Sequence, residues 1–323
     1  MFEHGIKRQV SDKFPVLHSF RAKNVERKIL DGQEFSDFWI SQLIDSGQPA
    51  LVGRLGGTEA RVLGCYLDIF KGKSLLDPFA TANSLLTFNR RNKQLKNGAG
   101  FYPISKQNII KFAQIYMQCM EETDVLGAWG TAFTWPEYLL AKRENVKFVP
   151  LVTTAPWVNP YMKEGLEYPP WSTSLNGKRI LIVSSFSRSF QSQFSRIDKI
   201  FPKSVCHDFN PEFLEAPTTQ GEDSSDITWF NHLEATMYKM QKIDFDVALI
   251  SAGSYSYPLA AFAKNLGKIG VHSGGELQLF FGVLGERWKN YFKYLEYKNE
   301  YWVRPLESER PANWKTIEGG CYW

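Results

Sequence analysis

Residues 49–67 read PALVGRLGGTEARVLGCYL, and this stretch joins the pattern of a buried strand to the pattern of a helix. Its first part is a mainly apolar run that ends at Leu55, as in the buried strands of parallel sheets. Gly56 and Gly57 follow, and apolar residues then recur at helical spacing at positions 62, 63, 66 and 67. We therefore predict a strand, a tight glycine turn and a helix whose N-terminus lies above the strand end.

The same alternation of strand and helix patterns continues along the chain. Further strand patterns occupy residues 123–129, 146–151, 178–183, 246–250 and 269–272. Helix patterns lie around 233–243 and after Ser105, which is placed as an N-cap. Alternation of this kind predicts an α/β fold with an open, mostly parallel sheet and helices on both faces.

Bulk properties argue against several classes of protein. The net charge of +4 is small and the charged residues are interspersed, so we expect no nucleic-acid partner. The four cysteines form no C-x-x-C pair, which argues against a zinc or redox site. Without a signal-peptide pattern or a membrane-length apolar run, we expect a cytoplasmic protein, at most peripheral at the inner membrane face. The basic run 90–93 fits a solvated surface, with anionic lipid headgroups or a phosphate as the alternative.

In open parallel sheets, ligands bind at the carboxyl ends of strands, where helix N-termini direct backbone N–H groups at anions. The first such end carries Arg54, Gly56, Gly57 and Glu59. The glycines would let the backbone approach a phosphate, Arg54 would bind that phosphate, and Glu59 would hold a divalent metal or orient a sugar hydroxyl. The alternative is an ordinary strand-to-helix turn in which Glu59 favours the helix dipole.

A second loop, after the strand at 246–250, contains Gly253, Ser254 and Tyr255. Its small and hydroxyl residues suit a diphosphate or ribose, and the tyrosine could stack on a base. Capping of the next helix by Ser254 or Ser256 is the structural alternative.

A third loop follows the strand at 269–272 and offers acid–base groups together with a glycine turn. Its candidate residues are His272, Gly274, Gly275, Glu276 and Gln278. His272 and Glu276 are candidate catalytic bases beside Glu59. A lone histidine at a strand end also fits a purely structural role.

A fourth loop, after the strand at 178–183, offers Ser185 and Arg188 to phosphate or sugar oxygens. A solvated connection is the alternative for this loop.

Together these four segments resemble the GT-D-fold glycosyltransferases found with bacterial capsule and exopolysaccharide biosynthesis. The similarity runs from Arg54 to the C-terminus, through residues 97–103, 175–178, 190–193, 250–255 and 282–288, and the closing run 318–323 is similar too. It implies one Rossmann-like GT-D domain, which we place at residues 36–323. The residues themselves indicate a polar lead-in over 1–35, and the stretch 153–176, rich in Pro, Trp and Tyr, indicates an internal hinge or loop.

The resemblance also implies an activity and a cofactor. A sugar would pass from a nucleotide diphosphate sugar to a hydroxyl of a glycan or lipid-linked saccharide. A UDP-sugar is the favoured donor. The family often uses Mn²⁺ or Mg²⁺ at a D-x-E motif that ends the first strand. Here Gly57 replaces the Asp and Glu59 is kept, so Glu59 is the candidate metal ligand and the motif supplies one carboxylate.

Two other classes of protein compete with this interpretation. A non-catalytic nucleotide-binding or scaffold protein of a polysaccharide assembly complex would suit the replaced Asp. A Rossmann dehydrogenase or methyltransferase is disfavoured because no G-x-G-x-x-G follows a strand.

Overall fold

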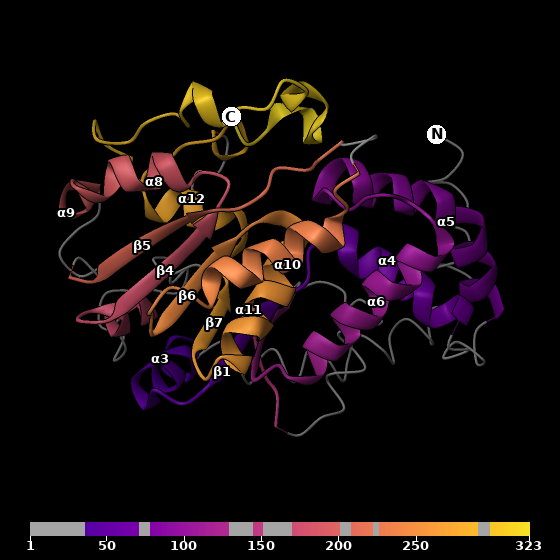
Figure 1. Ribbon diagram of the computed structural model, residues 1–323, viewed down its shortest axis with the longest axis horizontal. Coiled ribbons are helices and arrows are strands. Elements are labelled where there is room, and N and C mark those ends of the chain that lie inside the picture. Colours follow the sequence, from indigo (N-terminus) through magenta and orange to yellow (C-terminus); the bar gives the residue numbers. More distant parts are fainter. Residues whose placement is uncertain are drawn as a thin grey trace.

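A seven-stranded sheet with the order β3-β2-β1-β7-β6-β4-β5 forms the centre of the computed structural model (Figure 1). The structure describes residues 36–70, 78–128, 145–150, 170–200, 208–221, 226–289 and 298–323. All strand pairs are parallel. The strands are β1 (Ala50–Arg54), β2 (Val125–Ala128), β3 (Lys147–Pro150), β4 (Arg179–Ser184), β5 (Asn210–Glu215), β6 (Val247–Ser251) and β7 (Ile269–His272). The predicted open parallel α/β fold is confirmed.

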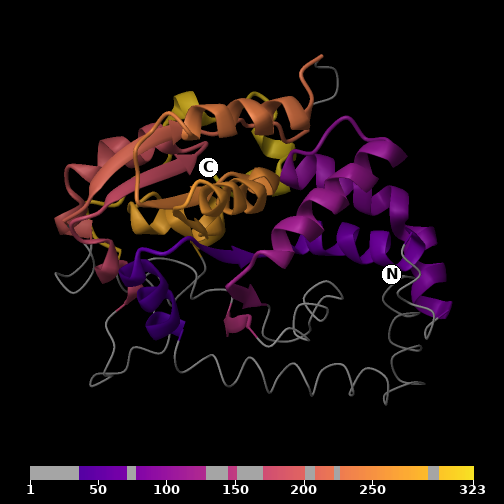
Figure 2. The same ribbon diagram turned by 60° about the horizontal axis from the view of Figure 1, so that its bottom comes forward.

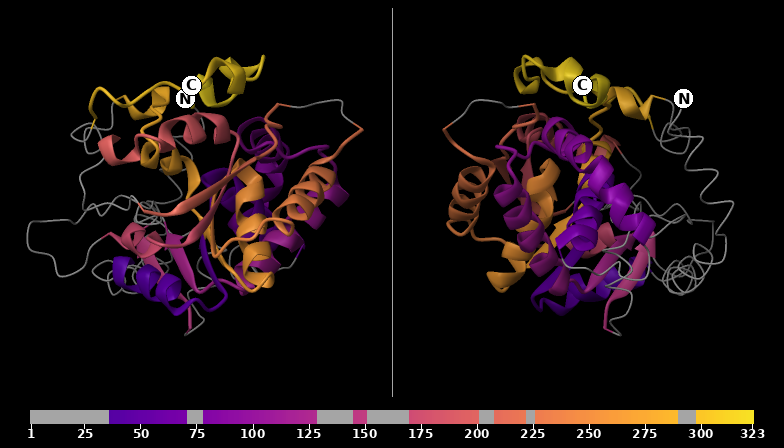
Figure 3. Two further views of the ribbon diagram at one scale, coloured as in Figure 1. Left: turned by 60° about the vertical axis from the view of Figure 1, so that its left-hand side comes forward. Right: turned by 90° about the vertical axis from the view of Figure 1, so that its right-hand side faces the viewer.

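Helices cover both faces of the sheet (Figure 3). They are α3 (Ser36–Ser46), α4 (Gly57–Phe70), α5 (Pro78–Ala99), α6 (Lys106–Glu121), α8 (Ser187–Phe194), α9 (Ile197–Ile200), α10 (Trp229–Met240), α11 (Ser256–Asn265) and α12 (Leu277–Phe280). Short 3-10 turns include η2 (Trp171–Leu175), η3 (Gly253–Tyr255), η4 (Gly274–Glu276), η5 (Glu286–Trp288) and η6 (Glu307–Glu309). Two more, η7 (Trp314–Thr316) and η8 (Glu318–Gly320), lie near the C-terminus.

Side chains of successive strand residues enter two separate cores, as the two-residue period of a strand requires. Leu51 of β1 packs with α4, α6, α10 and α11 on one face. Val52, the next residue, packs with α3, α8 and α12 on the other face. Both faces are therefore apolar, which explains why the predicted strands read as unbroken hydrophobic runs.

The sequence-based element boundaries agree with most of the structure. Ser105 caps α6 as predicted, because its Oγ accepts the backbone N–H of Asn108 at 3.1 Å. Strand β5 was not predicted. The lead-in at 1–35 and most of the 153–176 hinge or loop lie outside the described residues, and the remainder of that stretch contains η2. Within the part of the chain that is described, no helix is long and apolar enough to cross a bilayer.

The chain leaves the paired strands β1 and β7 toward opposite faces of the sheet. After β1 it enters α4, which packs in the first core, and after β7 it reaches α12, which packs in the second. Connections that diverge in this way leave a crevice at the carboxyl ends of the two strands. The fold therefore places a site where Arg54 and His272 end their strands.

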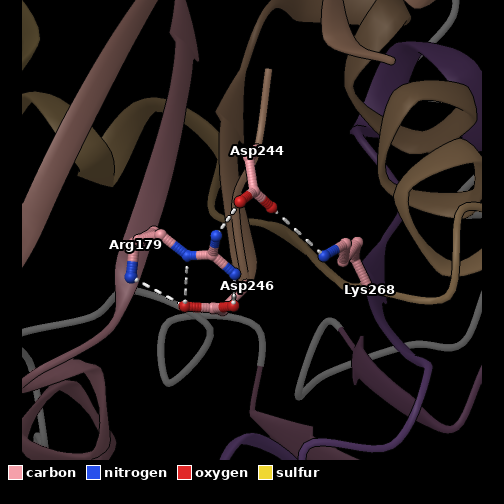
Figure 4. Close-up of polar contacts among 4 residues, drawn as sticks. All are labelled: Arg179, Asp244, Asp246 and Lys268. Atoms are coloured by element: carbon pink, nitrogen blue, oxygen red, sulfur yellow. Dashed lines mark hydrogen bonds and ion pairs between the residues drawn. The ribbon is translucent and has the colours of Figure 1, made fainter. Parts of the chain in front are cut away.

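A charged network lies at the amino ends of the strands, away from the crevice at their carboxyl ends (Figure 4). Arg179 at the start of β4 donates to Asp246 through its backbone N–H at 2.9 Å and through Nη2 at 2.6 Å. It also pairs with Asp244, which Lys268 approaches at 3.7 Å. These contacts tie the starts of β4, β6 and β7 together.

Replacing Asp246 by asparagine is expected to flatten the acid limb of the stability curve. Hydrogen bonds from Arg179 lower the pKa of Asp246 from 3.8 to about 2. The stabilisation is therefore complete above about pH 4 and is lost as the pH falls toward 2. In urea unfolding, the free energy of unfolding of wild type should exceed that of Asp246→Asn at pH 7. The two free energies should become equal near pH 2. Parallel curves, or an equal effect of the exposed control Asp226→Asn, would contradict this role.

Candidate functional site

A cavity of about 220 Å³ lies at the carboxyl ends of β1, β4, β6 and β7. It brings together many of the predicted residues from four separate loops. They are Arg54, Gly56, Gly57, Glu59, Ser185, Gly253, His272, Gly274, Gly275 and Gln278. Glu276, Arg188, Ser254 and Tyr255 do not line it. Predicted residues as far apart in the sequence as Arg54 and Gln278 thus line one cavity.

Glu59 lies in the first turn of α4, and its carboxylate folds back over Gly56. A Cβ atom at Gly56 would lie 2.2 Å from Glu59 Oε2, so the glycine makes this position accessible to the carboxylate. Burial raises the pKa of Glu59 from 4.5 to about 7, and the negative charge of Glu318 contributes in the same direction. Near neutral pH the group can therefore take up or release a proton, as a general base must.

Arg54 is held by Glu276 in a buried ion pair. Arg54 Nη1 donates to Glu276 Oε2 at 2.8 Å and to the carbonyl of Ser273 at 3.1 Å. Gly274 is required here for two reasons: its φ is +64°, and a Cβ atom would lie 2.6 Å from Arg54 Cζ. Glu276 was a candidate base, but the structure places it as the partner that orients Arg54.

His272 ends β7 and is 8% exposed. Its Nδ1 is a buried atom without a hydrogen-bond partner among the described residues. Burial lowers the pKa of His272 well below its usual value, and the charge of Arg54 acts in the same direction. The imidazole is therefore neutral at physiological pH and a weaker base than Glu59. An unsatisfied buried nitrogen beside a cavity suits a ligand hydroxyl.

Ser254 and Tyr255 build the cavity wall without facing it. Ser254 Oγ donates to the carbonyl of Ala99 at 2.6 Å and accepts Trp229 Nε1–H at 2.9 Å. The Tyr255 ring stacks on Trp229 with centroids 5.2 Å apart, and its hydroxyl lies 2.9 Å from Thr219 Oγ1. Their predicted contact with a donor is therefore replaced by a structural role, in which they hold the end of α5 against η3.

The loop after β4 is divided between the cavity and a structural contact. Ser185 lines the cavity, whereas the guanidinium of Arg188 pairs with Glu215 at 2.8 Å. The backbone N–H groups of Arg188 and Ser189 donate to Glu309 Oε1 at 2.9 and 3.0 Å. A protein carboxylate therefore already satisfies the N-terminus of α8, and the structure does not bring Arg188 to the predicted donor site.

The C-terminal segment supplies a wall that the sequence-based site did not include. Figures 1 and 3 show this segment passing over α8 and α12. Arg287, Glu318, Tyr322 and Trp323 line the cavity. Arg287 Nη2 lies 2.7 Å from Glu318 Oε2, and its guanidinium lies 4.2 Å from the centre of the Tyr322 ring. The runs 282–288 and 318–323 carried part of the family resemblance, which was the signal available for these residues.

The end of α5 and the loop after β5 form the remaining wall. Gln220 is the informative residue there, because its Oε1 is buried without a partner among the described residues. A Cβ atom at Gly253 would lie 3.3 Å from Gln220 Nε2. The other lining residues that the sequence did not single out as site residues are Thr58, Gly98, Ala99, Phe186, Thr218, Ser251 and Ser256.

The residues of the cavity do not form a metal site by themselves. No group of three or more His, Cys, Asp or Glu side chains in the described ranges is placed to hold an ion. Glu59 has a pKa near 7, and Glu318 is paired with Arg287. A hard cation prefers several ionised oxygen ligands, so this donor set does not fit the expected Mn²⁺ or Mg²⁺ well.

Comparisons of the chain with protein-family models, with curated proteins and with solved structures found no match. The resemblance to the GT-D glycosyltransferases therefore stays a prediction from the sequence.

Proposed function

We propose that the protein is a glycosyltransferase that moves a sugar from a nucleotide diphosphate sugar to a hydroxyl of a glycan or lipid-linked acceptor in surface polysaccharide biosynthesis. The position of Glu59 carries the proposal. Its carboxylate has a pKa near 7 and lines a cavity at the carboxyl ends of four parallel strands. Such crevices are where open α/β sheets bind nucleotides.

The donor diphosphate would lie between α4 and the glycine turn of η4. The first turn of α4 lines the cavity with Gly57, Thr58 and Glu59, and the positive dipole end of a helix favours an anion at this place. The turn at Gly274 and Gly275 has no side chains to keep a phosphate away. Arg54 and Arg287 offer further N–H donors to a phosphate, and each is held in place by a carboxylate partner.

The chemical step needs a base and stabilisation of the leaving group. The acceptor oxygen forms a bond to the anomeric carbon while the bond from that carbon to the diphosphate oxygen breaks. The nucleoside diphosphate leaves with the electron pair, and its charge is met by the backbone N–H groups and Arg54. Glu59 takes the acceptor proton. His272 Nδ1 accepts a hydrogen bond from a sugar hydroxyl and holds the donor in place.

A panel of nucleotide sugars tests the proposal. At least one nucleoside diphosphate should raise the melting temperature, and the matching nucleotide sugar should release it slowly to water. Because the cavity carboxylates do not fit a metal well, the rise should persist in EDTA. No response to any nucleotide would overturn the proposal. Binding without turnover of any donor and acceptor would favour the nucleotide-binding scaffold instead.

A further inference from the structure

A second cavity opens beside the first, between α4 and α5, which lie side by side at one end of the molecule (Figure 2). Its volume is about 370 Å³. We call it the α4/α5 groove, and it is lined by Thr58, Arg61, Arg90, Lys93, Gln94, Asn97, Gly98 and Glu318. Thr58, Gly98 and Glu318 also line the donor cavity. The two spaces therefore adjoin along these three residues. An acceptor in the groove would lie next to a donor in the first cavity, as the transfer of a group between two substrates requires.

Most of the charged residues that line the groove are cationic. Arg61, Arg90 and Lys93 are exposed cationic residues that line it. The one carboxylate among its lining residues, Glu318, is paired with Arg287 in the neighbouring cavity. Three cations around one groove attract an anion and raise its local concentration. A neutral glycan would not use this charge.

The face of α5 that lines the groove also carries an exposed apolar residue. Leu86, Arg90, Lys93 and Asn97 are spaced by four, three and four residues, so they lie along one face of the helix. The Leu86 side chain is 86% exposed, and neighbouring Leu85 is 59% exposed. At 1.5 Å per residue, Leu86 lies about 16 Å along the helix from Asn97. Going outward from the donor cavity, this face therefore presents an amide, then two cations, then a leucine.

We propose that the α4/α5 groove is the acceptor subsite and that it takes an amphiphile in which a sugar is joined to a lipid through phosphate or diphosphate. The sugar lies at Asn97 and Gly98, next to the donor cavity. The phosphate contacts Arg90, Lys93 and Arg61, and the lipid chain leaves past Leu86. This assignment rests on the proposed transferase function and names the acceptor class of the same site.

The chemistry of the step is then complete. A hydroxyl of the acceptor sugar attacks the anomeric carbon of the donor where the groove and the donor cavity adjoin, at Thr58 and Gly98. Its proton passes to Glu59, and the nucleoside diphosphate leaves from the donor cavity. The acceptor phosphate stays attached to its sugar and lipid throughout, so the basic residues bind it and take no part in bond breaking.

Vesicle co-sedimentation tests the assignment with the full chain. The probes are phosphatidylcholine vesicles that contain polyprenyl diphosphate, and phosphatidylcholine vesicles with the same total charge from phosphatidylglycerol. Wild type should bind the first at least tenfold more tightly than the second. Arg90→Ala/Lys93→Ala should lose at least tenfold in affinity for the first. The matched double variant Lys239→Ala/Lys242→Ala, which removes two exposed lysines at and just after the end of α10, should not.

Two further readouts separate the groove from the donor cavity and from a general membrane contact. Leu86→Ser should weaken binding to the polyprenyl vesicles and should keep the rise in melting temperature caused by a nucleoside diphosphate. Arg90→Ala/Lys93→Ala should keep the rise in melting temperature caused by a nucleoside diphosphate. Equal binding to both vesicle types, or no effect of the groove variants, would overturn the acceptor assignment. Loss of every nucleotide response in wild type would instead contradict the proposed function.

Discussion

Replacing Glu59 by glutamine should remove donor turnover while making the folded protein more stable at alkaline pH. Positioned general bases contribute about 10²–10⁴-fold to rate, so we expect turnover to fall by that factor. In wild type, kcat/KM should rise with pH through about 7, because burial raises the pKa of the base to that value. The residual activity of Glu59→Gln should lack this limb.

The stability effect of Glu59→Gln has a definite sign. The pKa of Glu59 is raised from 4.5 to about 7 in the fold, so the folded state favours the protonated acid. Wild type therefore has full stability below about pH 4.5, loses about 3 kcal/mol as the pH rises to 7, and stays at that lower level above it. Glu59→Gln cannot ionise and should melt about 5 °C higher than wild type at pH 8 and at the same temperature at pH 4.

Thermal unfolding at pH 4 and pH 8, together with a pH–rate profile, checks both expectations. The control is Glu234→Gln, which removes an exposed carboxylate on α10 and should change neither quantity. An active Glu59→Gln protein, or one destabilised at pH 8, would show that Glu59 is not a buried base.

Among the substitutions proposed for this protein, replacing Glu276 by alanine should cause the largest loss of stability. Its partner Arg54 has a side chain that is 10% exposed and would lose the carboxylate oxygen that lies 2.8 Å from its Nη1. Breaking a buried pair on one side destabilises proteins by about 3–5 kcal/mol. Removing both charges, as in Arg54→Met/Glu276→Leu, should recover a large part of that loss, because neither charge is then buried alone.

A double-mutant cycle in urea isolates this coupling. The losses of unfolding free energy in the single variants Arg54→Met and Glu276→Leu should together be much larger than the loss in the double variant. The exposed pair Arg188–Glu215, with side chains 56% and 55% exposed, is the control, and Glu215→Ala should have little effect. Additive effects in the Arg54–Glu276 cycle would mean that the pair does not organise the site.

The strands that could be predicted from the sequence are those buried on both faces. Residues 180–183 of β4 read ILIV, and every one of them is buried in the sheet interior. Strand β5 reads NPEFLE and was not predicted, because it lies at the sheet edge and pairs only with β4. Pro211 and the polar residues of β5 are typical of edge strands, and in a sequence they resemble a loop.

The helix α5 and the C-terminal wall were missed for a different reason. Helix α5 contains Asn, Thr and Gly residues of low helix propensity, and its contact with α4 is a tertiary interaction. Arg287 and Glu318 form their ion pair across 31 residues of sequence. Spacing identifies residues that follow a strand directly, such as Glu59 and His272. It does not show which way a side chain turns in a 3-10 turn, as Glu276 in η4 demonstrates.

A crystal structure with the nucleoside diphosphate that raises the melting temperature most tests the proposed donor site directly. The diphosphate should lie within hydrogen-bond distance of backbone N–H groups at the start of α4 and at Gly275. Glu59 should lie on the side of the diphosphate that faces Thr58 and Gly98. A nucleotide bound elsewhere, or a cavity that stays closed to every nucleotide tested, would contradict the proposed donor site.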